Sequence, residues 1–435
     1  MAAAQQAIGV IGGGALGLGA ALRLAEGGRR VVVIEREAEL GGLAAGFRPG
    51  ADSAATLEKF YHHIFRTDRT IIRTIKHVGL GERLVWKRPV TASLRDGHVY
   101  PMSLGGILRF DAIPLVDRLR FGTMLAALKL TPGERPFAGS TAAGWSRRVA
   151  GPRAYAALIE PILEGKFGGR ADEITMSWLW SRFHERSLAL GYLRGGFQQL
   201  YDALGERIQA LGGEILLGSA AQRICSRAGA VHVETSAGAC EFERVVVTAP
   251  QRVFERMAEG LPDGWSERHP GPEFYNAQVL ILALDRQLTD SYWISIGDPG
   301  YPFLVVVEHT NFMPTTDYGG RHLVYLGNYL PPDHPLLRQN DAELLETFLP
   351  AIRRLNPAFQ PEWVQQRWLF QAPFAQPIVT EGYLRRLPPL RTPLRGVYLA
   401  TMAHVYPQDR GQNYSLALGR RVADLLLRDV GAARA

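Results

Sequence analysis

Three glycines near the beginning of the chain have the spacing of a turn that binds phosphate groups. Gly12, Gly14 and Gly17 form the pattern G-x-G-x-x-G. In such a turn the first glycine permits a tight bend, the second lets the backbone approach a pyrophosphate, and the third lets a helix pack closely on a strand. The N–H groups and the dipole at the start of that helix favour phosphates, so we expect Ala15 and Leu16 to contact the ligand too.

The stretches on either side of this turn predict the elements that a dinucleotide site requires. Residues 8–11 are an apolar run typical of a buried strand, residues 16–25 are rich in alanine and leucine and predict a helix, and residues 31–34 predict a second strand. The second strand ends at Glu35, 21 positions after Gly14. A carboxylate there can accept hydrogen bonds from both ribose hydroxyls, which favours an adenosine with a free 2′-hydroxyl.

A second pair of glycines distinguishes FAD from NAD as the expected cofactor. Gly41 and Gly42 follow Glu35-Arg36 and precede Leu43. This arrangement resembles the extended fingerprint of FAD-binding flavoproteins, in which the second glycine pair runs the backbone along the pyrophosphate and ribityl part of the cofactor. The site of a simple NAD-dependent dehydrogenase does not need it. We therefore expect FAD, and we include Arg36, Gly41, Gly42 and Leu43 among its contacts.

Composition places the chain among globular proteins with more than one lobe. It has 435 residues, of which 46% are hydrophobic and 21% are charged, and this length is too great for a single ordinary core. The net charge of +7 permits anionic ligands or a membrane surface. No basic block and no interleaving of aromatic and basic residues indicates nucleic-acid binding. We expect no nucleic-acid partner and, without a cluster of metal-ligand residues, no metal.

Nothing in the sequence indicates export or insertion into a membrane. No signal peptide precedes the glycine-rich strand, and no window of about 20 uninterrupted apolar residues predicts a membrane span. We therefore expect a cytoplasmic protein. Peripheral contact with a membrane stays open, because residues 113–130 are apolar with interspersed basic residues. The two cysteines, Cys225 and Cys240, are expected to be reduced.

The order of elements along the chain resembles that of the flavoprotein superfamily that includes protoporphyrinogen oxidases, phytoene desaturases and amine oxidases. The resemblance covers nearly the full length. Besides the amino-terminal fingerprint, it rests on the turn and helix of residues 195–200, the strand end at residues 247–250, and the strand, loop and helix of residues 397–427. It implies that Gly195 and Ala249 contact the cofactor.

The last helix of such proteins points its amino terminus at the pyrimidine end of the flavin. A reduced flavin carries negative charge there, and a helix amino terminus stabilises that charge. The resemblance therefore implies that Gly411, Asn413 and Tyr414 lie beside the flavin ring.

Together with this resemblance, the pattern of strands and helices predicts an α/β fold with a Rossmann-like FAD-binding domain of the glutathione-reductase type. We expect that domain to be assembled from three discontinuous segments, residues 1–60, 191–265 and 381–435. Two stretches separate them. Residues 61–190 are predicted to form a mostly helical insertion, and residues 266–380 a strand-rich substrate domain.

A second resemblance concerns residues 61–68, Tyr-His-His-Ile-Phe-Arg-Thr-Asp. They are similar to the Pro-His-Ile-Phe-His-Thr loop of UDP-galactopyranose mutases, which share the broad fold and use reduced flavin as a nucleophile on a sugar, with no net redox change. His63 matches the first histidine of that loop, which sits by the flavin. His62 replaces the proline, and Arg66 replaces the second histidine. The alternative interpretation is that His62 and His63 are ordinary, partly buried polar residues.

The expected activity is that of an FAD-dependent oxidoreductase of the oxidase, dehydrogenase or desaturase type, which transfers a hydride from a bulky, partly apolar substrate to flavin N5. Amine oxidases commonly carry a lysine late in the substrate lobe. All five lysines here precede the strand-rich region, so this chain has no lysine at the corresponding place. His63, Tyr406 and Asp409 are the candidate catalytic residues for lining the flavin face. Arg182 and Arg367 could grip a carboxylate or a diphosphate.

Two alternatives stay open. The first is a mutase-like enzyme that acts on a nucleotide sugar with reduced flavin, and the second is a protein in which FAD only stabilises the fold. The sequence does not determine the electron acceptor, the oligomeric state or the small-molecule substrate. The candidates for the substrate are a lipid-like molecule and a nucleotide sugar.

Overall fold

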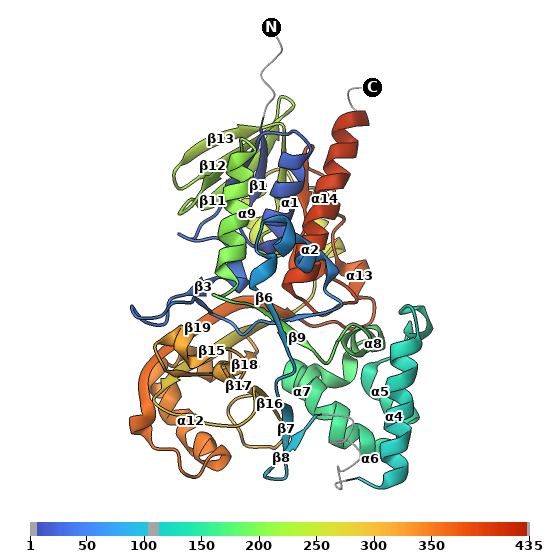
Figure 1. Ribbon diagram of the computed structural model, residues 1–435. Coiled ribbons are helices and arrows are strands. Elements are labelled where there is room, and N and C mark those ends of the chain that lie inside the picture. Colours follow the sequence, from blue (N-terminus) through green and yellow to red (C-terminus); the bar gives the residue numbers. More distant parts are fainter. Residues whose placement is uncertain (1–6, 103–112, 433–435) are drawn as a thin grey trace.

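The computed structural model describes residues 7–102 and 113–432. The outer ends of the expected segments 1–60 and 381–435, and part of the stretch considered for a signal peptide, therefore lie outside the described residues. Figure 1 shows a parallel sheet with its helices next to both chain ends, and a second sheet and a helical lobe below it. Segments that are distant in sequence build both of these sheets.

Five parallel strands form the first sheet, in the order β10-β2-β1-β14-β20. They are β1 (Ile8–Ile11), β2 (Val31–Ile34), β10 (Glu214–Leu216), β14 (Arg244–Val247) and β20 (Val397–Leu399). β1 and β2 are buried along their whole length, which explains their apolar runs, because helices cover one face of the sheet and residues 221–242 pack on the other. All three of the expected discontinuous segments contribute strands.

Close packing joins the last helix of the chain to the first. Helix α1 (Ala15–Glu26) lies against helix α14 (Gln412–Ala432), as Figure 1 shows. A Cβ atom on Gly19 would lie 2.9 Å from the carbonyl oxygen of Leu416, and one on Gly419 would overlap the carbonyl oxygen of Leu16. Only glycine fits at these two positions, so residues 400 positions apart determine how closely the two backbones approach.

A small antiparallel sheet contains both cysteines. It consists of β11 (Ala221–Arg227), β12 (Ala230–Thr235) and β13 (Gly238–Phe242), with β12 in the middle. Cys225 lies opposite His232, and Cys240 lies opposite Val233, so the two cysteines are on the outer strands. Both are free thiols.

The second large sheet has seven strands, in the order β19-β15-β18-β17-β16-β7-β8. The region 266–380 supplies β15 (Phe274–Leu284), β16 (Trp293–Ile296), β17 (Val305–Glu308), β18 (His322–Leu330) and β19 (Val364–Pro377). The last two strands, β7 (Thr91–Arg95) and β8 (His98–Pro101), come from the stretch expected to be helical. β7 pairs in parallel with β16.

Residues 61–190 are therefore not uniformly helical. Besides β7 and β8, this stretch contains β5 (Ile64–Phe65) and β6 (Leu84–Lys87), which form a three-stranded sheet with β9 (Leu190–Leu193), the strand that begins at its end. β5 and β6 are short and partly exposed, so they lack the continuous buried runs that identified β1 and β2.

The helical lobe follows in the same stretch. Its main helices are α4 (Leu115–Leu130), α5 (Ala142–Ala150), α7 (Glu160–Phe167) and α8 (Met176–His184). α4 buries Phe121, Met124 and Leu128, which share one face, while Leu115 and Val116 are exposed. Among the described residues, no helix combines the length and apolar character needed to cross a bilayer.

Shorter elements connect these parts. They are β3 (Gly46–Phe47), β4 (Leu57–Glu58), α2 (Arg69–His77), α6 (Pro152–Ala154), α9 (Gln198–Ala210), α10 (Gln251–Met257), α11 (Trp265–Arg268), α12 (Asp341–Leu355) and α13 (Tyr383–Arg386).

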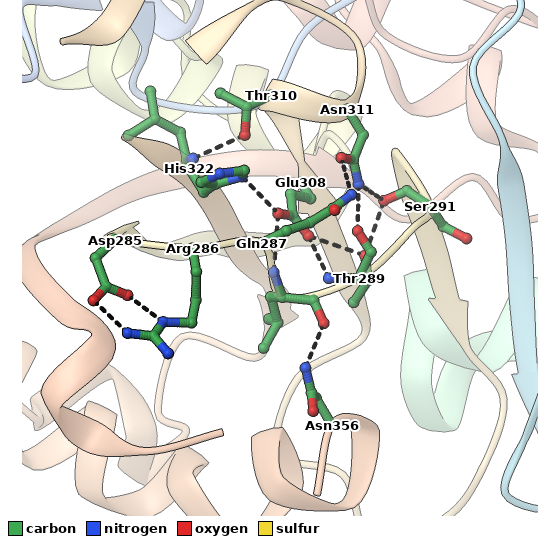
Figure 2. Close-up of polar contacts among 12 residues, drawn as sticks. Asp285, Arg286, Gln287, Thr289, Ser291, Glu308, Thr310, Asn311, His322 and Asn356 are labelled. Atoms are coloured by element: carbon green, nitrogen blue, oxygen red, sulfur yellow. Dashed lines mark hydrogen bonds and ion pairs between the residues drawn. The ribbon is translucent and has the colours of Figure 1, made fainter. Parts of the chain in front are cut away.

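A buried carboxylate at the end of β17 anchors the loop that leads into β16, as Figure 2 shows. Glu308 accepts hydrogen bonds from the backbone N–H groups of Leu288 at 3.1 Å and Thr289 at 2.6 Å. The amide of Asn311 donates to the carbonyl oxygens of Thr289 at 2.7 Å and Ser291 at 2.9 Å. The chain continues from this loop into two aromatic residues, Tyr292 and Trp293, and Trp293 lines the cavity described below.

Candidate functional site

The glycine turn after β1 leads into a helix whose start is buried. Ala15 and Leu16 are buried at the first turn of α1, yet no side chain caps this end and the first turn carries no acidic residue. A Cβ atom on Gly17 would overlap the carbonyl oxygen of Gly12, which itself has a φ of +108°. A buried helix start without a cap leaves N–H groups in need of a partner, and an anion such as a phosphate fits there.

The second glycine pair packs directly on this turn. Gly14 and Gly41 form a parallel bridge, and the N–H of Gly41 donates to the carbonyl oxygen of Gly13 at 2.9 Å. A Cβ atom on Gly42 would lie 3.2 Å from the Cα of Gly14. Leu43 follows in a short 3₁₀ turn and is half-buried. The two glycine segments named by the sequence analysis therefore form one continuous backbone surface.

Glu35 extends from the end of β2 toward the same turn. Its Oε2 atom accepts a hydrogen bond from the N–H of Gly13 at 2.6 Å, and its Oε1 atom accepts one from the N–H of Glu37 at 2.9 Å. Two N–H donors thus hold the carboxylate in one orientation. Arg36 points outward, with 71% of its side chain exposed, and pairs with Glu37 at 2.9 Å.

The remaining nucleotide-side candidates occupy neighbouring chain turns. Ala249 follows β14, the strand next to β1, so it lies at the same carboxyl edge of the sheet as the glycine turn. Gly195 precedes α9 with a φ of +94°, and its carbonyl oxygen accepts hydrogen bonds from the N–H of Thr56 at 3.1 Å and from the Thr56 hydroxyl at 3.0 Å.

The start of α14 combines a structural contact with an unpaired donor. The Oδ1 atom of Asn413 accepts hydrogen bonds from the N–H groups of Thr70 at 2.9 Å and Ile71 at 3.1 Å, so it binds the first turn of α2. Gln412 accepts a hydrogen bond from the Tyr201 hydroxyl, whereas its Nε2 atom is buried with no partner among the described residues. A free donor at a helix amino terminus fits a ligand that carries negative charge.

A cavity of about 230 Å³ opens beside the start of α14. Its walls come from the loop 61–68, helices α7 and α8, strands β16 to β18, and residues 409–414. Gly411, Asn413 and Tyr414, for which the sequence analysis predicts a position beside the flavin, line this cavity. Aromatic and apolar side chains such as Phe65 and Trp293 alternate with charged ones.

His62 and His63 both line this cavity. The Nδ1 atom of His63 lies 3.1 Å from the hydroxyl oxygen of Tyr292, and its ring packs edge-on to Trp293. The Nδ1 atom of His62 lies 2.6 Å from the carbonyl oxygen of Phe60, to which it donates. Burial lowers the pKa of His62 to about 4 and that of His63 to about 3. Both rings are therefore neutral near pH 7.

Asp409 also lines the cavity, but two cations hold it. Its Oδ2 atom accepts from the ammonium of Lys166 and, at 3.2 Å, from Nη1 of Arg182. Burial alone would raise the pKa of Asp409, but Lys166 and Arg182 outweigh this effect and hold the pKa below its usual value. Asp409 is therefore an ionised counterion. Tyr406 is not among the described residues that line the cavity; it stacks on Tyr383 with ring centroids 5.4 Å apart.

The sequence analysis gave no binding or catalytic role to three cations of this cavity. Lys166 reaches it from α7, Arg186 lies at its mouth after α8, and Arg410 precedes α14. The available signal for Lys166 was that residues 164–168 resemble the stretch that roofs the substrate pocket in the oxidases of this superfamily. Arg367, by contrast, pairs with Asp341 at 2.6 Å and is not among the described lining residues.

Comparison with known proteins places this geometry in context. The sequence matches the family model described as flavin containing amine oxidoreductase over residues 17–427. A provisionally named protoporphyrinogen oxidase from Exiguobacterium sp. 255-15 has a similar structure, with 18% identity and a TM-score of 0.77 over 98% of this chain and 99% of that chain. A comparison with curated protein sequences finds no match.

Two further solved structures are similar over nearly their full length. Reduced UDP-galactopyranose mutase is 17% identical, with a TM-score of 0.73 over 97% of this chain and 95% of that chain. Cyclohexylamine oxidase from Brevibacterium oxydans IH-35A is 14% identical, with a TM-score of 0.70 over 98% of this chain and 100% of that chain. At these identities the similarities establish a shared fold.

Proposed function

The chain belongs to the family of flavin containing amine oxidoreductases and is an FAD-dependent oxidoreductase, and from this premise we propose that it oxidises a bulky, partly apolar small molecule. When bound, FAD supplies the acceptor for a hydride at its N5 atom. The residues of the chain bind and orient both reactants and exclude water, and such positioning contributes much of the catalysis. The partly aromatic cavity beside α14 supports a substrate of this kind.

We propose that the five-stranded sheet and its helices form a Rossmann-like FAD-binding domain. The observation that carries this assignment is the buried, uncapped start of α1, where free N–H groups suit the pyrophosphate. Glu35, held by two N–H groups, suits the ribose. The further proposed contacts are Gly12, Gly14, Ala15, Leu16, Gly17, Arg36, Gly41, Gly42, Leu43, Gly195, Ala249, Gly411, Asn413 and Tyr414.

The cavity is proposed as the substrate site. His63 is neutral and bound to Tyr292, so it can donate or accept one hydrogen bond toward a reactant without changing charge at pH 7. Asp409 acts as a positioning residue, because it holds Lys166 and Arg182 in place. Tyr406 is not among the described lining residues; it stacks on Tyr383 and packs against the core of the helical lobe.

Anaerobic mixing tests the proposed reaction. The purified protein should show flavin absorbance, and a true substrate should bleach it in the absence of oxygen, with recovery when air is admitted. An enzyme that turns over a compound only after dithionite has reduced the flavin, and that no compound reduces directly, would contradict the proposal.

A second candidate is a mutase that uses reduced flavin on a nucleotide sugar. It is favoured by the loop 61–68, which resembles that of UDP-galactopyranose mutases and lines the cavity with His63. Turnover that depends on prior reduction by dithionite would support it. A third candidate, FAD as a structural group only, predicts no turnover in either assay and a lower melting temperature when FAD is removed.

A further inference from the structure

The charges of the cavity are unevenly distributed. Lys166, Arg182 and Arg410 lie together around one carboxylate, Asp409. The side chains of Lys166 and Arg182 are only 12% and 15% exposed, and that of Asp409 is 23% exposed. Arg186 lies nearby at the more exposed mouth of the cavity. Arg182, Arg410 and Lys166, whose pKa burial lowers from 10.5 to about 7, thus share a single negative charge.

The partners of Arg410 are neutral. Its Nε atom donates to Oε1 of Gln376 at 3.1 Å, and its Nη2 atom donates to the hydroxyl of Tyr329. Arg186 faces the ring of Phe65, with its guanidinium carbon 5.5 Å from the ring centroid. Within the described residues, no carboxylate forms an ion pair with either arginine.

The other two carboxylates of the cavity form a separate group. Asp68 accepts a hydrogen bond from the N–H of Phe65 at 2.7 Å. Burial, together with the nearby charge of Glu185, raises the pKa of Asp68 to about 6. In the part of the chain that the structure describes, neither acid forms an ion pair with Lys166, Arg182 or Arg410. The cavity therefore has an acidic region and a distinct cationic region, and the surplus of positive charge stays at the latter.

Enclosed cations with too few counterions are unfavourable unless a ligand completes them. An arginine presents a planar fork that binds carboxylates and phosphates through two parallel N–H donors. A protonated amine, such as the cyclohexylamine named for one of the similar oxidases, would instead be repelled by the two arginines at this end of the cavity, Arg182 and Arg410.

We infer that the substrate carries a carboxylate or phosphate group, and that Arg182, Arg410 and Lys166 bind this group at the cationic end of the cavity. The inference rests on the proposed function, since it takes the cavity as the substrate site. It assigns to these residues the recognition of an acid, which sets this chain apart from oxidases that take amines.

Ligand binding to the FAD-loaded protein tests this inference without turnover. Inorganic diphosphate, benzoate and benzylamine are each titrated while flavin absorbance and tryptophan fluorescence are recorded. Benzoate or diphosphate should bind saturably and more weakly as NaCl rises, because salt screens the attraction, and benzylamine should bind at least about tenfold more weakly than the better anion. The tighter of the two anions identifies the acid as a carboxylate or a phosphate.

Charge-neutralising variants locate the site. Arg182→Gln and Arg410→Gln should each weaken anion binding by about tenfold or more, since each removes a charge-assisted hydrogen bond. Arg367→Gln removes an arginine that pairs with Asp341 outside the cavity lining, and it should bind anions like the wild type. FAD content and melting temperature are measured for each variant, and the wild-type comparison of anions with benzylamine needs no variant at all.

The outcomes separate the inference from the proposed function. If benzylamine binds as tightly as either anion, or if the loaded protein binds neither anion, the cationic end does not recognise an acid and the inference is wrong. Anion binding that survives Arg182→Gln and Arg410→Gln alike also overturns it. A protein that takes up no FAD would instead contradict the proposed function, before any anion is added.

Discussion

Lys166 and Asp409 form an ion pair inside the cavity although 243 positions separate them in the chain. Lys166 belongs to helix α7 of the helical lobe, whereas Asp409 lies just before α14, which packs on α1 beside the five-stranded sheet. The pair therefore joins two lobes at the point where the substrate is proposed to bind. Its consequences, and those of the other contacts, can be measured.

Replacing the two partners of this pair should have unequal effects. Asp409→Asn leaves Lys166 and Arg182 without their shared counterion, and we expect a loss of about 3 kcal/mol in the free energy of unfolding, the lower range for breaking a buried pair. Lys166→Met should cost less, because Arg182 still neutralises Asp409. Urea denaturation of both variants measures the difference, and equal stabilities would mean that Arg182 does not compensate.

Two glycines of the turn should respond differently to alanine. In Gly14→Ala the nearest atom to the new Cβ is the Cα of Gly42 at 3.8 Å, so the protein should fold, but the methyl group would occupy space needed by a pyrophosphate. We expect FAD affinity to fall by about tenfold or more. Gly17→Ala overlaps the carbonyl oxygen of Gly12 and should destabilise the fold by about 2 kcal/mol. FAD content and melting temperature separate the two effects; full FAD retention in Gly14→Ala would contradict the pyrophosphate assignment.

Glu35→Ala should weaken FAD retention. The carboxylate is proposed to bind the ribose, and the loss of a charged hydrogen bond is worth about 2 kcal/mol, or roughly thirtyfold in Kd. Glu206→Ala provides the control, since Glu206 is an exposed glutamate of α9 and is not among the proposed cofactor contacts. Quenching of flavin fluorescence on reconstitution measures both affinities. Equal affinities for the two variants would remove Glu35 from the site.

His63→Ala should spare FAD binding and lower turnover by about tenfold or more, because the ring is proposed to orient a reactant. Burial holds the pKa of His63 at about 3, so the ring stays neutral and its ionisation should not appear in a rate profile between pH 5 and pH 9. His77→Ala, on the surface of α2, serves as the control. Unchanged turnover in His63→Ala would show that the ring does not face the reactants.

The buried Glu58 makes stability depend on pH. It accepts hydrogen bonds from the hydroxyl of Tyr192 and the N–H of Phe197, each at 2.7 Å, and burial raises its pKa from 4.5 to about 7. A carboxyl with a raised pKa in the folded state stabilises fully below pH 4.5, and this contribution is lost as the pH rises toward 7. The loss is on the order of 3 kcal/mol.

Glu58→Gln isolates this effect, because an amide can accept from Phe197 and donate to Tyr192 without ionising. The difference in melting temperature between variant and wild type should therefore favour the variant more at pH 8 than at pH 5. Other buried acids such as Glu308 cancel in the comparison. A difference that is the same at both pH values would mean that Glu58 is not protonated in the folded protein.

Local signals predicted the elements around the five-stranded sheet well. The strands at residues 8–11 and 31–34 are confirmed, and the helix expected at residues 16–25 is α1, because each is a continuous run of mostly apolar residues. The last helix, expected within residues 397–427, extends over residues 412–432. The strands β5, β6 and β7 were not predicted, since each has only two to five residues and pairs with a strand that is distant in the sequence.

The sequence by itself determined where the glycine turns fall, and with them the family and the cofactor, because the chemistry of a phosphate turn lies within about 40 consecutive residues. Only the tertiary structure decided the character of the cavity. Lys166, Arg182 and Arg410 come from separate elements, and no local pattern encodes their convergence on Asp409. Neither Arg367 nor Tyr406 is among the described lining residues: Arg367 pairs with Asp341, and Tyr406 stacks on Tyr383. The direction of such a side chain depends on the partners that its element packs against.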